Sequence, residues 1–87
     1  MRPYVDSVEK NLILREFDSK LSSDELVWHR DSKDRRVTVV KGTGWKIQYE
    51  NSLPVPMVEG VSYWIEKDEW HRLIKGNSSL KLEIEEL

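Results

Sequence analysis

Short runs of alternating apolar and polar residues follow one another along most of the chain, and this pattern predicts β-strands. The alternation is clearest over residues 36–41, 45–50 and 80–85. A period of two residues is typical of a strand with one buried and one polar face. Less regular apolar runs extend the expected strands to residues 11–17, 25–29, 53–58, 61–65 and 70–75. No long window has a helical period, so we expect little or no helix.

Turn-forming segments separate these runs. Gly42-Thr43-Gly44 predicts a hairpin, because glycine adopts positive φ without steric cost. Prolines at positions 54 and 56 remove backbone donors, so residues 53–58 are expected to form an edge or irregular strand. Residues 30–35 are nearly all charged and are predicted to form a solvated loop. Further turns or connectors are expected at residues 18–24, 51–52, 59–60, 66–69 and 76–79.

The spacing of these elements predicts an all-β fold. Seven or eight short strands at regular intervals favour a sandwich or barrel. A chain of 87 residues corresponds to one domain with one small core. Residues 1–10 carry little signal, so we expect an N-terminal segment there and a β-barrel domain over residues 11–87.

Composition and charge exclude several functional classes. The chain has no cysteine, which removes disulfides and thiolate metal sites and favours a cytoplasmic location. The net charge of −2, with both signs interspersed, argues against nucleic-acid binding, which needs a clustered basic face. We also expect no membrane association, because no apolar run approaches the ~20 residues that span a bilayer, and the N-terminus has no apolar signal-peptide region. Four tryptophans are expected mainly to fill the small core.

The only two histidines of the chain, His29 and His71, provide the main candidate for a site. Each follows a tryptophan, and the central strands separate the two in sequence. If the strands close into a small barrel, both imidazoles can face one cavity.

Around these histidines the chain resembles the cupin superfamily, whose members carry two short motifs separated by an intermotif region. The resemblance covers residues 26–77, and the spacing within both motifs is kept. In the first motif, His29 and Asp31 stand at the two histidine positions, Arg35 at the glutamate and Gly42 at the closing glycine. In the second, the glycine, proline, glycine, histidine and asparagine positions hold Gly60, Glu66, Asp68, His71 and Lys75.

The resemblance implies a jelly-roll β-barrel and a degenerate version of the cupin metal site. That site commonly consists of three histidines and a glutamate that bind iron, manganese, nickel or zinc. Here His29 and His71 keep their positions, and Asp31 is a carboxylate substitute two residues from His29, on the same face of a strand. Arg35 is no ligand, because a guanidinium has no lone pair to offer. Asp34 stays open as an alternative to Asp31, since the strand alternation ends near this loop.

Two classes of function follow from this resemblance. In the first, a divalent metal held by His29, Asp31 and His71 and a small polar or anionic ligand share the barrel. Two histidines and one carboxylate suit ferrous iron or zinc, so an oxygenase, a lyase or an isomerase fits the family. In the second, the chain is a metal-free module for ligand binding, regulation or protein interaction.

Candidate ligand-binding residues are Arg35, Gln48, Tyr63 and Trp64. Arg35 has two interpretations: it points into the cavity and binds an anion, or it joins Arg36 in surface pairs with the nearby aspartates. The partners expected are a small-molecule ligand and a second copy of the chain. We predict a homodimer that pairs through residues 12–14 or 80–84.

Overall fold

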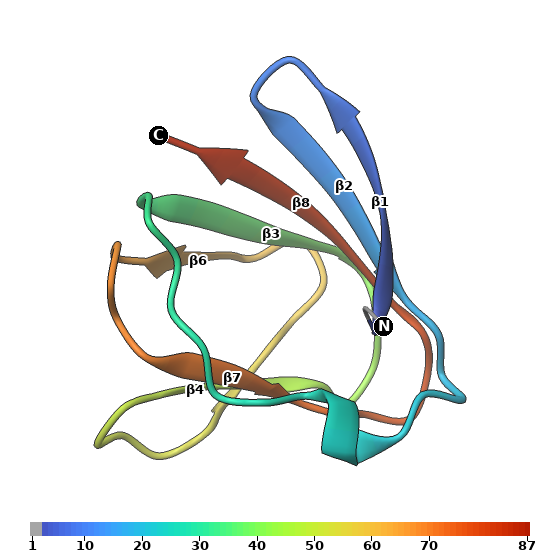
Figure 1. The fold of residues 1–87 in the computed structure, drawn as a ribbon. Coiled ribbons are helices and arrows are strands. Elements are labelled where there is room, and N and C mark those ends of the chain that lie inside the picture. Colours follow the sequence, from blue (N-terminus) through green and yellow to red (C-terminus); the bar gives the residue numbers. More distant parts are fainter. Residues whose placement is uncertain (1–2) are drawn as a thin grey trace.

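The structure, a computed structural model, describes residues 3–87, and their backbone is almost entirely β (Figure 1). The elements of this part of the chain, in order, are β1 (Tyr4–Glu9), β2 (Leu12–Phe17), the 3-10 helix η1 (Ser23–Glu25), β3 (Arg35–Lys41), β4 (Lys46–Tyr49), β5 (Val55–Pro56), β6 (Ser62–Ile65), β7 (His71–Ile74) and β8 (Leu80–Glu86). The predicted all-β class is therefore confirmed. None of the described residues belongs to a helix long and apolar enough to cross a membrane.

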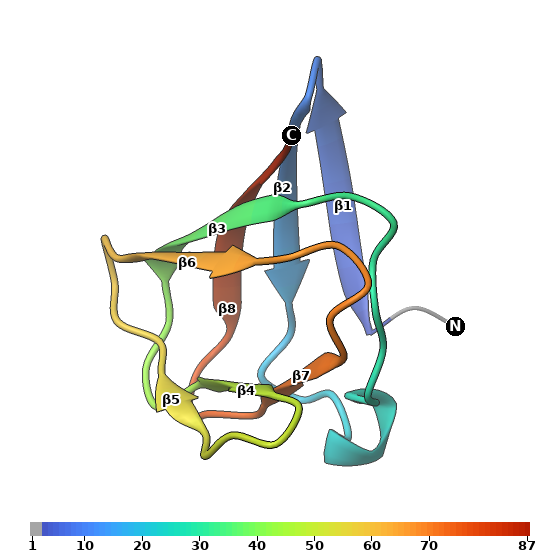
Figure 2. The same cartoon turned by 90° about the vertical axis from the view of Figure 1, so that its left-hand side faces the viewer.

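The strands form two antiparallel sheets that face each other. The larger sheet has the order β1-β2-β8-β3-β6, and the smaller has the order β5-β4-β7 (Figure 2). No ladder between residues 3–87 joins the two sheets, so a closed barrel is not shown. The prolines at positions 54 and 56 agree with the place of β5 at a sheet edge, as the sequence predicts.

The core lies between the sheets, and strand alternation decides which side chains enter it. On β8, Leu80, Leu82 and Ile84 are buried, whereas Lys81 and Glu83 between them are exposed. Other buried apolar side chains come from both sheets and include Ile13, Phe17, Val37, Val39, Trp45, Ile47, Met57 and Ile65. Each such side chain stabilises the fold by roughly 1.5–3 kcal/mol through removal from water.

The tryptophans correct one expectation. Only Trp45, 1% exposed, belongs to the core. Trp28, Trp64 and Trp70 are 39–46% exposed, so the prediction that they fill the core is wrong. Two of them are covered on one face by arginine instead, since Arg72 lies over Trp28 and Arg30 over Trp70.

The strand β1 lies in the segment for which the sequence analysis predicts no element. It pairs with β2 from Tyr4↔Phe17 to Glu9↔Leu12. Its apolar Val5 and Val8 are exposed, 76% and 67%, so they mark no buried face. The inward residues of this strand are instead Tyr4 and the polar Asp6, which hydrophobic alternation does not detect.

The prediction of a strand over residues 25–29 is wrong. Ser23–Glu25 forms η1, which begins where the Ser22 side chain accepts a hydrogen bond from the Asp24 backbone. This capping by a short polar side chain favours a helical turn over an extended strand. Of the predicted strand, only His29 pairs, in an isolated bridge to His71.

The predicted hairpin at Gly42–Gly44 is also wrong, because β3 and β4 lie in different sheets. The chain instead crosses from one sheet to the other here. Gly44 keeps a positive φ of 78°, and the turn packs against the segment after β7, where the Asn77 backbone donates to the Thr43 carbonyl. The glycines indicate a turn correctly, but local sequence does not reveal which strands pair.

The segments proposed for dimer pairing lie inside the larger sheet. β2, which contains residues 12–14, is flanked by β1 and β8, and β8 is flanked by β2 and β3. Neither has an open backbone edge, so pairing through these strands is wrong. The homodimer itself stays a prediction, and the edges of this sheet are β1 and β6.

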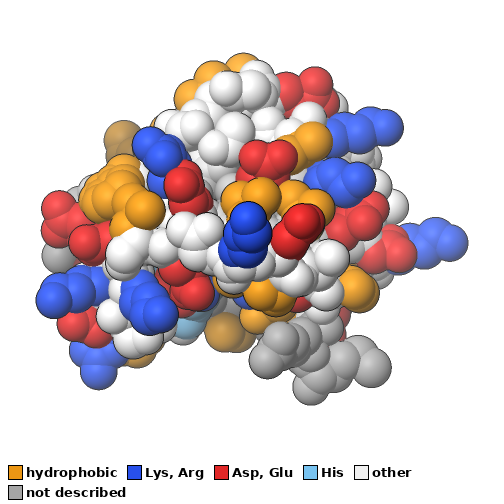
Figure 3. Space-filling view, turned by 90° about the horizontal axis from the view of Figure 1, so that it is seen from above, with side chains coloured by type: hydrophobic (Ala, Val, Ile, Leu, Met, Phe, Trp, Pro, Cys, Tyr) orange, Lys and Arg blue, Asp and Glu red, His pale blue; other side chains and the backbone are white. Residues whose placement is uncertain are grey.

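The outer surface carries both signs of charge. Figure 3 shows basic and acidic side chains interspersed on the face seen from above, next to small groups of hydrophobic side chains. A representative pair is Arg36 with Glu85, which meet at 2.6 Å on the outer face of β3 and β8. Exposed pairs of this kind contribute only about 0–1 kcal/mol to stability.

Candidate metal and ligand site

A cavity of about 350 Å³ opens between the two sheets. Its walls are mostly apolar, with side chains from both sheets such as Phe17, Val37, Ile47, Leu73 and Leu82. Six polar side chains line it as well: Arg15, Glu25, His29, Asp31, Arg35 and His71. An apolar cavity with a few converging polar groups is the usual form of a small-molecule site.

Main-chain hydrogen bonds bring the two histidines together. His29 and His71 exchange both backbone hydrogen bonds, at 3.0 and 2.9 Å, although they are far apart in sequence. The two rings are 4.3 Å apart between centroids. The Asp31 carbonyl accepts from the Asp68 backbone at 2.7 Å, which holds the loop after His29 against the turn before β7. Asp68 has a φ of 63° and stands where the cupin motif has glycine, a residue that adopts such φ values freely.

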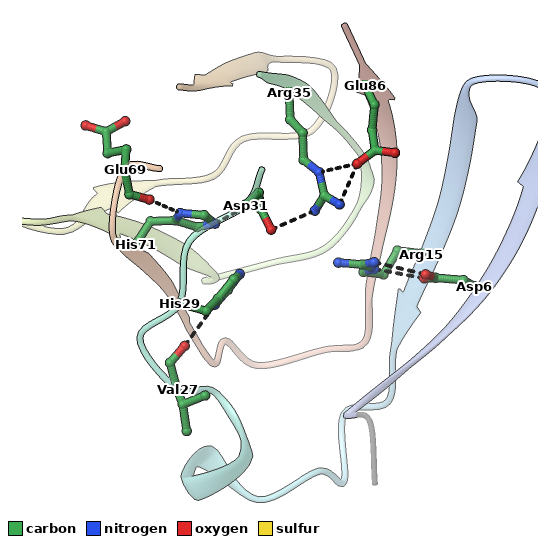
Figure 4. Close-up of polar contacts among 9 residues, drawn as sticks. All are labelled: Asp6, Arg15, Val27, His29, Asp31, Arg35, Glu69, His71 and Glu86. Atoms are coloured by element: carbon green, nitrogen blue, oxygen red, sulfur yellow. Dashed lines mark hydrogen bonds and ion pairs between the residues drawn. The ribbon is translucent and has the colours of Figure 1, made fainter. Parts of the chain in front are cut away.

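The hydrogen bonds of the rings determine which nitrogen is available for a ligand. Nδ1 of His29 lies 3.0 Å from the Val27 carbonyl, and Nδ1 of His71 lies 2.8 Å from the Glu69 carbonyl (Figure 4). A carbonyl only accepts, so both Nδ1 atoms carry the proton. In a neutral ring, Nε2 then presents its lone pair. This backbone carbonyl contact at the second nitrogen is typical of metal-binding histidines.

Asp31 completes a group of three donors. One ligand atom from each of His29, Asp31 and His71 lies within 4.8 Å of the others. Oδ2 of Asp31 is buried and has no hydrogen-bond partner among residues 3–87. His71 Nε2 lies 3.3 Å from it, an ion-pair distance if the ring is protonated, but the contact does not form a hydrogen bond. A buried carboxylate oxygen that faces a lone pair is costly unless a cation or a proton lies between them.

The charge state of Asp31 suits this role. Burial by itself raises the pKa of the Asp31 carboxyl, but interaction with a protonated His71 ring and the positive charge of Arg35 outweigh it. The pKa therefore lies below its ordinary value of 3.8, and the group is a carboxylate at neutral pH.

A divalent metal fits the three donors in type and nearly in distance. Two imidazole nitrogens and a carboxylate oxygen suit zinc or ferrous iron, with positions left for other ligands. Ligands about 2.1 Å from one ion are roughly 3–4 Å apart, so small side-chain rotations close the 4.8 Å group around a metal. His71 is 3% exposed, whereas His29 is exposed, so the group is open to the cavity mouth on one side.

Arg35 both lines the cavity and forms ion pairs, so it has features of both interpretations. It lines the cavity, as the anion-binding interpretation requires. Its guanidinium is also engaged, at 3.3 Å from Asp31 and with two hydrogen bonds to Glu86 at 2.8 and 3.0 Å. These pairs are largely shielded, with side chains only 13–28% exposed. The solvated loop predicted over residues 30–35 is therefore correct for the exposed Arg30, Ser32 and Lys33 and wrong for the half-buried Asp31, Asp34 and Arg35.

The other candidates lie away from the cavity. Gln48 is on the outer face of β4 and accepts from Arg72, and the Tyr63 hydroxyl bonds to backbone atoms of Pro56 and Val58. Trp64 is 46% exposed. None of the three lines the cavity.

Asp34 is not part of the three-donor group. Its carboxylate accepts a hydrogen bond from the Lys67 backbone at 2.8 Å. Of the two aspartates left open by the sequence, the structure brings Asp31 to the histidines.

Sequence reasoning missed Arg15 and the acidic residues that hold the arginines. Arg15 lies between Ile13 and Phe17 in the alternation of β2, and Glu86 continues the series of buried positions on β8. A charged residue in phase with buried apolar neighbours is directed inward, and this signal is visible in the sequence. Reading every charged residue as solvent-facing overlooks this signal.

Comparison with known proteins identifies the fold and no family. No protein-family model matches the chain, and no curated protein matches it. Among solved structures, protein NMB1881 from Neisseria meningitidis superposes with a TM-score of 0.68 at 16% identity, over 97% of this chain and 81% of that one. The FeII form of HppE gives 0.72 at 18%, over 97% and 50%. Hydroxypropylphosphonic acid epoxidase from S. wedmorenis gives 0.70 at 19%, over 97% and 49%.

These similarities place the chain among cupin-like folds at the level of backbone architecture. The chain spans about half the length of the HppE and epoxidase chains that it matches. At such low identity the comparison supports a shared fold, and the function must be argued from the site.

Proposed function

We propose that this protein is a small cupin of the jelly-roll type that binds a divalent metal through His29, Asp31 and His71. The observation that supports this most strongly is Oδ2 of Asp31, which is buried without a hydrogen bond from residues 3–87 and lies 3.3 Å from Nε2 of His71. A cation between these atoms satisfies both. The similar HppE structures include Fe(II) and Co(II) forms, which makes ferrous iron the first metal to test.

The residues around the three donors fit a metal site that also accepts a ligand. When bound, the metal supplies a Lewis acid with open positions, suited to an oxygenase, a lyase or an isomerase. The carbonyls of Val27 and Glu69 orient the two rings. Arg35 fixes the Asp31 carboxylate from the side away from the histidines.

The test is metal binding by the purified, untagged protein, measured by elemental analysis and by calorimetry with Fe(II), Mn(II), Ni(II) and Zn(II). We expect about one metal per chain, bound by the wild type and lost in the His29→Ala/His71→Ala variant. Asp31→Asn is expected to weaken binding by about tenfold or more, because a carboxylate ligand becomes a weak neutral one. Asp34→Asn is the matched control in the same loop and should bind metal as the wild type does.

A metal-free site is the alternative, and one contact favours it. If His71 is protonated, its Nε2 and the Asp31 carboxylate form an ion pair at 3.3 Å without any metal. In that case none of the four ions binds the wild type, and the metal proposal fails. The cavity then serves as a ligand site lined by an ion pair.

A further inference from the structure

Arg15 is a second guanidinium in the cavity wall, besides Arg35. It belongs to β2, which carries none of the three donors His29, Asp31 and His71. It projects inward from β2, between Ile13 and Phe17 in the strand alternation. Its side chain is only 12% exposed. Figure 4 shows its guanidinium directed from β2 toward the space between His29 and Arg35.

The contacts of Arg15 hold it in place and leave one edge available. Its Nε and Nη2 donate to the two carboxylate oxygens of Asp6 at 2.8 and 2.9 Å. The guanidinium also stacks over the Tyr4 ring, 3.7 Å from its centroid. Nη1 has no hydrogen-bond partner among residues 3–87. A guanidinium fixed on one side by a carboxylate and on one face by an aromatic ring loses little entropy when it binds an anion.

The charges in the cavity wall and those paired with them limit the charge of the ligand. Arg15, Arg35 and Asp31 line the cavity, and Asp6 and Glu86 lie outside the lining but pair with the two guanidinium groups, so the sum of these five groups is one net negative charge. A divalent cation on the three donors changes this to one net positive charge. Glu25 at the mouth is exposed and therefore screened. A monoanion balances the metal-loaded cavity, whereas a dianion reverses its charge.

We propose that Nη1 of Arg15 binds the carboxylate of a small monoanionic ligand whose apolar body lies against Phe17, Leu73 and Leu82. This rests on the proposed metal site, because the bound metal makes the cavity net positive. The cavity of about 350 Å³ admits a small acid and no large one. The selected class is a monocarboxylic acid, in contrast to the phosphonic acid for which the structurally similar epoxidase is named.

The experiment measures binding of hexanoate, hexanol and hexylphosphonate to the zinc-loaded protein by calorimetry and protein NMR. The three probes share one apolar chain and differ in the charge of the head group. Hexanoate is expected to bind about tenfold more tightly than hexanol, the effect of one hydrogen bond to a charged group. At a pH where it is a dianion, hexylphosphonate should bind less tightly than hexanoate.

Variants of Arg15 decide whether this residue is responsible. Arg15→Gln should reduce hexanoate binding about tenfold and leave hexanol binding and zinc affinity unchanged. Because that variant leaves Asp6 unpaired, Asp6→Asn/Arg15→Gln removes both charges and protects against misfolding. The matched controls are Arg36→Gln and Arg36→Gln/Glu85→Gln, which remove an ion pair from the outer face of the same sheet.

The possible outcomes separate this inference from the proposed function. If folded Arg15 variants bind hexanoate as the wild type does, with zinc affinity intact, the anion subsite is wrong and the metal site stands. If the wild type binds no metal, the proposed function fails. Hexanoate binding to the metal-free protein then decides whether the Arg15 site exists without it, and equal affinity for hexanoate and hexanol overturns it.

Discussion

His29 and His71 show how single residues acquire a defined role from backbone contacts. Each ring donates Nδ1 to the carbonyl two residues earlier, Val27 or Glu69, so the tautomer is set within a short segment. Asp31 lies where its charge is maintained, and one of its oxygens accepts no hydrogen bond from residues 3–87. The chemistry of the site therefore depends on three side chains, and the orientation of two of them is determined by main-chain atoms.

A prediction at this scale concerns Tyr49, whose hydroxyl donates to the Trp64 carbonyl at 2.9 Å. Burial raises the pKa of this phenol above its ordinary value of 10.0, so the folded state favours the protonated form. The stability contributed by the protonated Tyr49 phenol is fully present below pH 10.0 and is lost as pH rises through the raised pKa. Urea unfolding between about pH 8 and 11 should show a decline in the wild type that Tyr49→Phe reduces.

One result would directly contradict the Tyr49 prediction. All other ionisable groups are common to both proteins, so only the difference in stability between wild type and Tyr49→Phe reports on Tyr49. Parallel stability curves over the whole alkaline range would mean that this phenol has the same pKa in the folded and unfolded states.

Elements are positioned by the turns that connect the two sheets. The turn that contains Gly44 and the segment after β7 lie against each other, and Gly76 is the point of closest approach. A Cβ at position 76 would overlap the Thr43 carbonyl and the Trp45 backbone nitrogen. Gly60, in contrast, has a φ of 81° with open space around it.

We therefore predict unequal costs for two alanine substitutions. Gly76→Ala should lower the free energy of unfolding by about 3 kcal/mol or more, because backbone must move to make room. Gly60→Ala should cost roughly 1–2 kcal/mol, the strain of a left-handed conformation. Denaturant unfolding of both variants measures this, and equal costs would contradict the close packing at Gly76.

Of the eight described strands, β3, β4 and β8 are predictable from clear alternation and β2, β5, β6 and β7 from less regular apolar runs, so only β1 is missed. β5 is detected as irregular through its prolines, whereas β1 is missed because its inward side chains are not the apolar ones. The pairing of strands is not predictable from the local pattern, as Gly42–Gly44 shows. The motif spacing predicts the meeting of His29, Asp31 and His71, but Arg15 and Glu86 require the assumption that charged residues can face inward.

At the scale of the whole molecule, the three-donor group of His29, Asp31 and His71 connects segments that are distant in sequence. His29 and Asp31 precede β3 of the larger sheet, and His71 begins β7 of the smaller one. A ligand that binds only the folded state stabilises it, by about 2.7 kcal/mol at a hundred times its dissociation constant. Metal binding should therefore stabilise the contact between the two sheets.

The corresponding prediction is a rise in the midpoint of thermal unfolding when Zn(II) is added to the metal-free protein. Asp34→Asn should show the same rise, and Asp31→Asn should show little or none. Removal of the metal with a chelator should reverse the change in the wild type. An equal rise in all three proteins would indicate nonspecific binding of zinc elsewhere.

The reciprocal backbone bridge between His29 and His71 has an implication for how such a site can diversify. Since peptide groups hold positions 29 and 71 in register, the side chains there can be exchanged while the positions stay fixed. Cysteine or aspartate at either position would be presented to the same space with a different affinity for hard and soft cations. If the site binds a metal as proposed, we expect a single substitution at position 29 or 71 to change the preferred ion while the backbone bridge is kept.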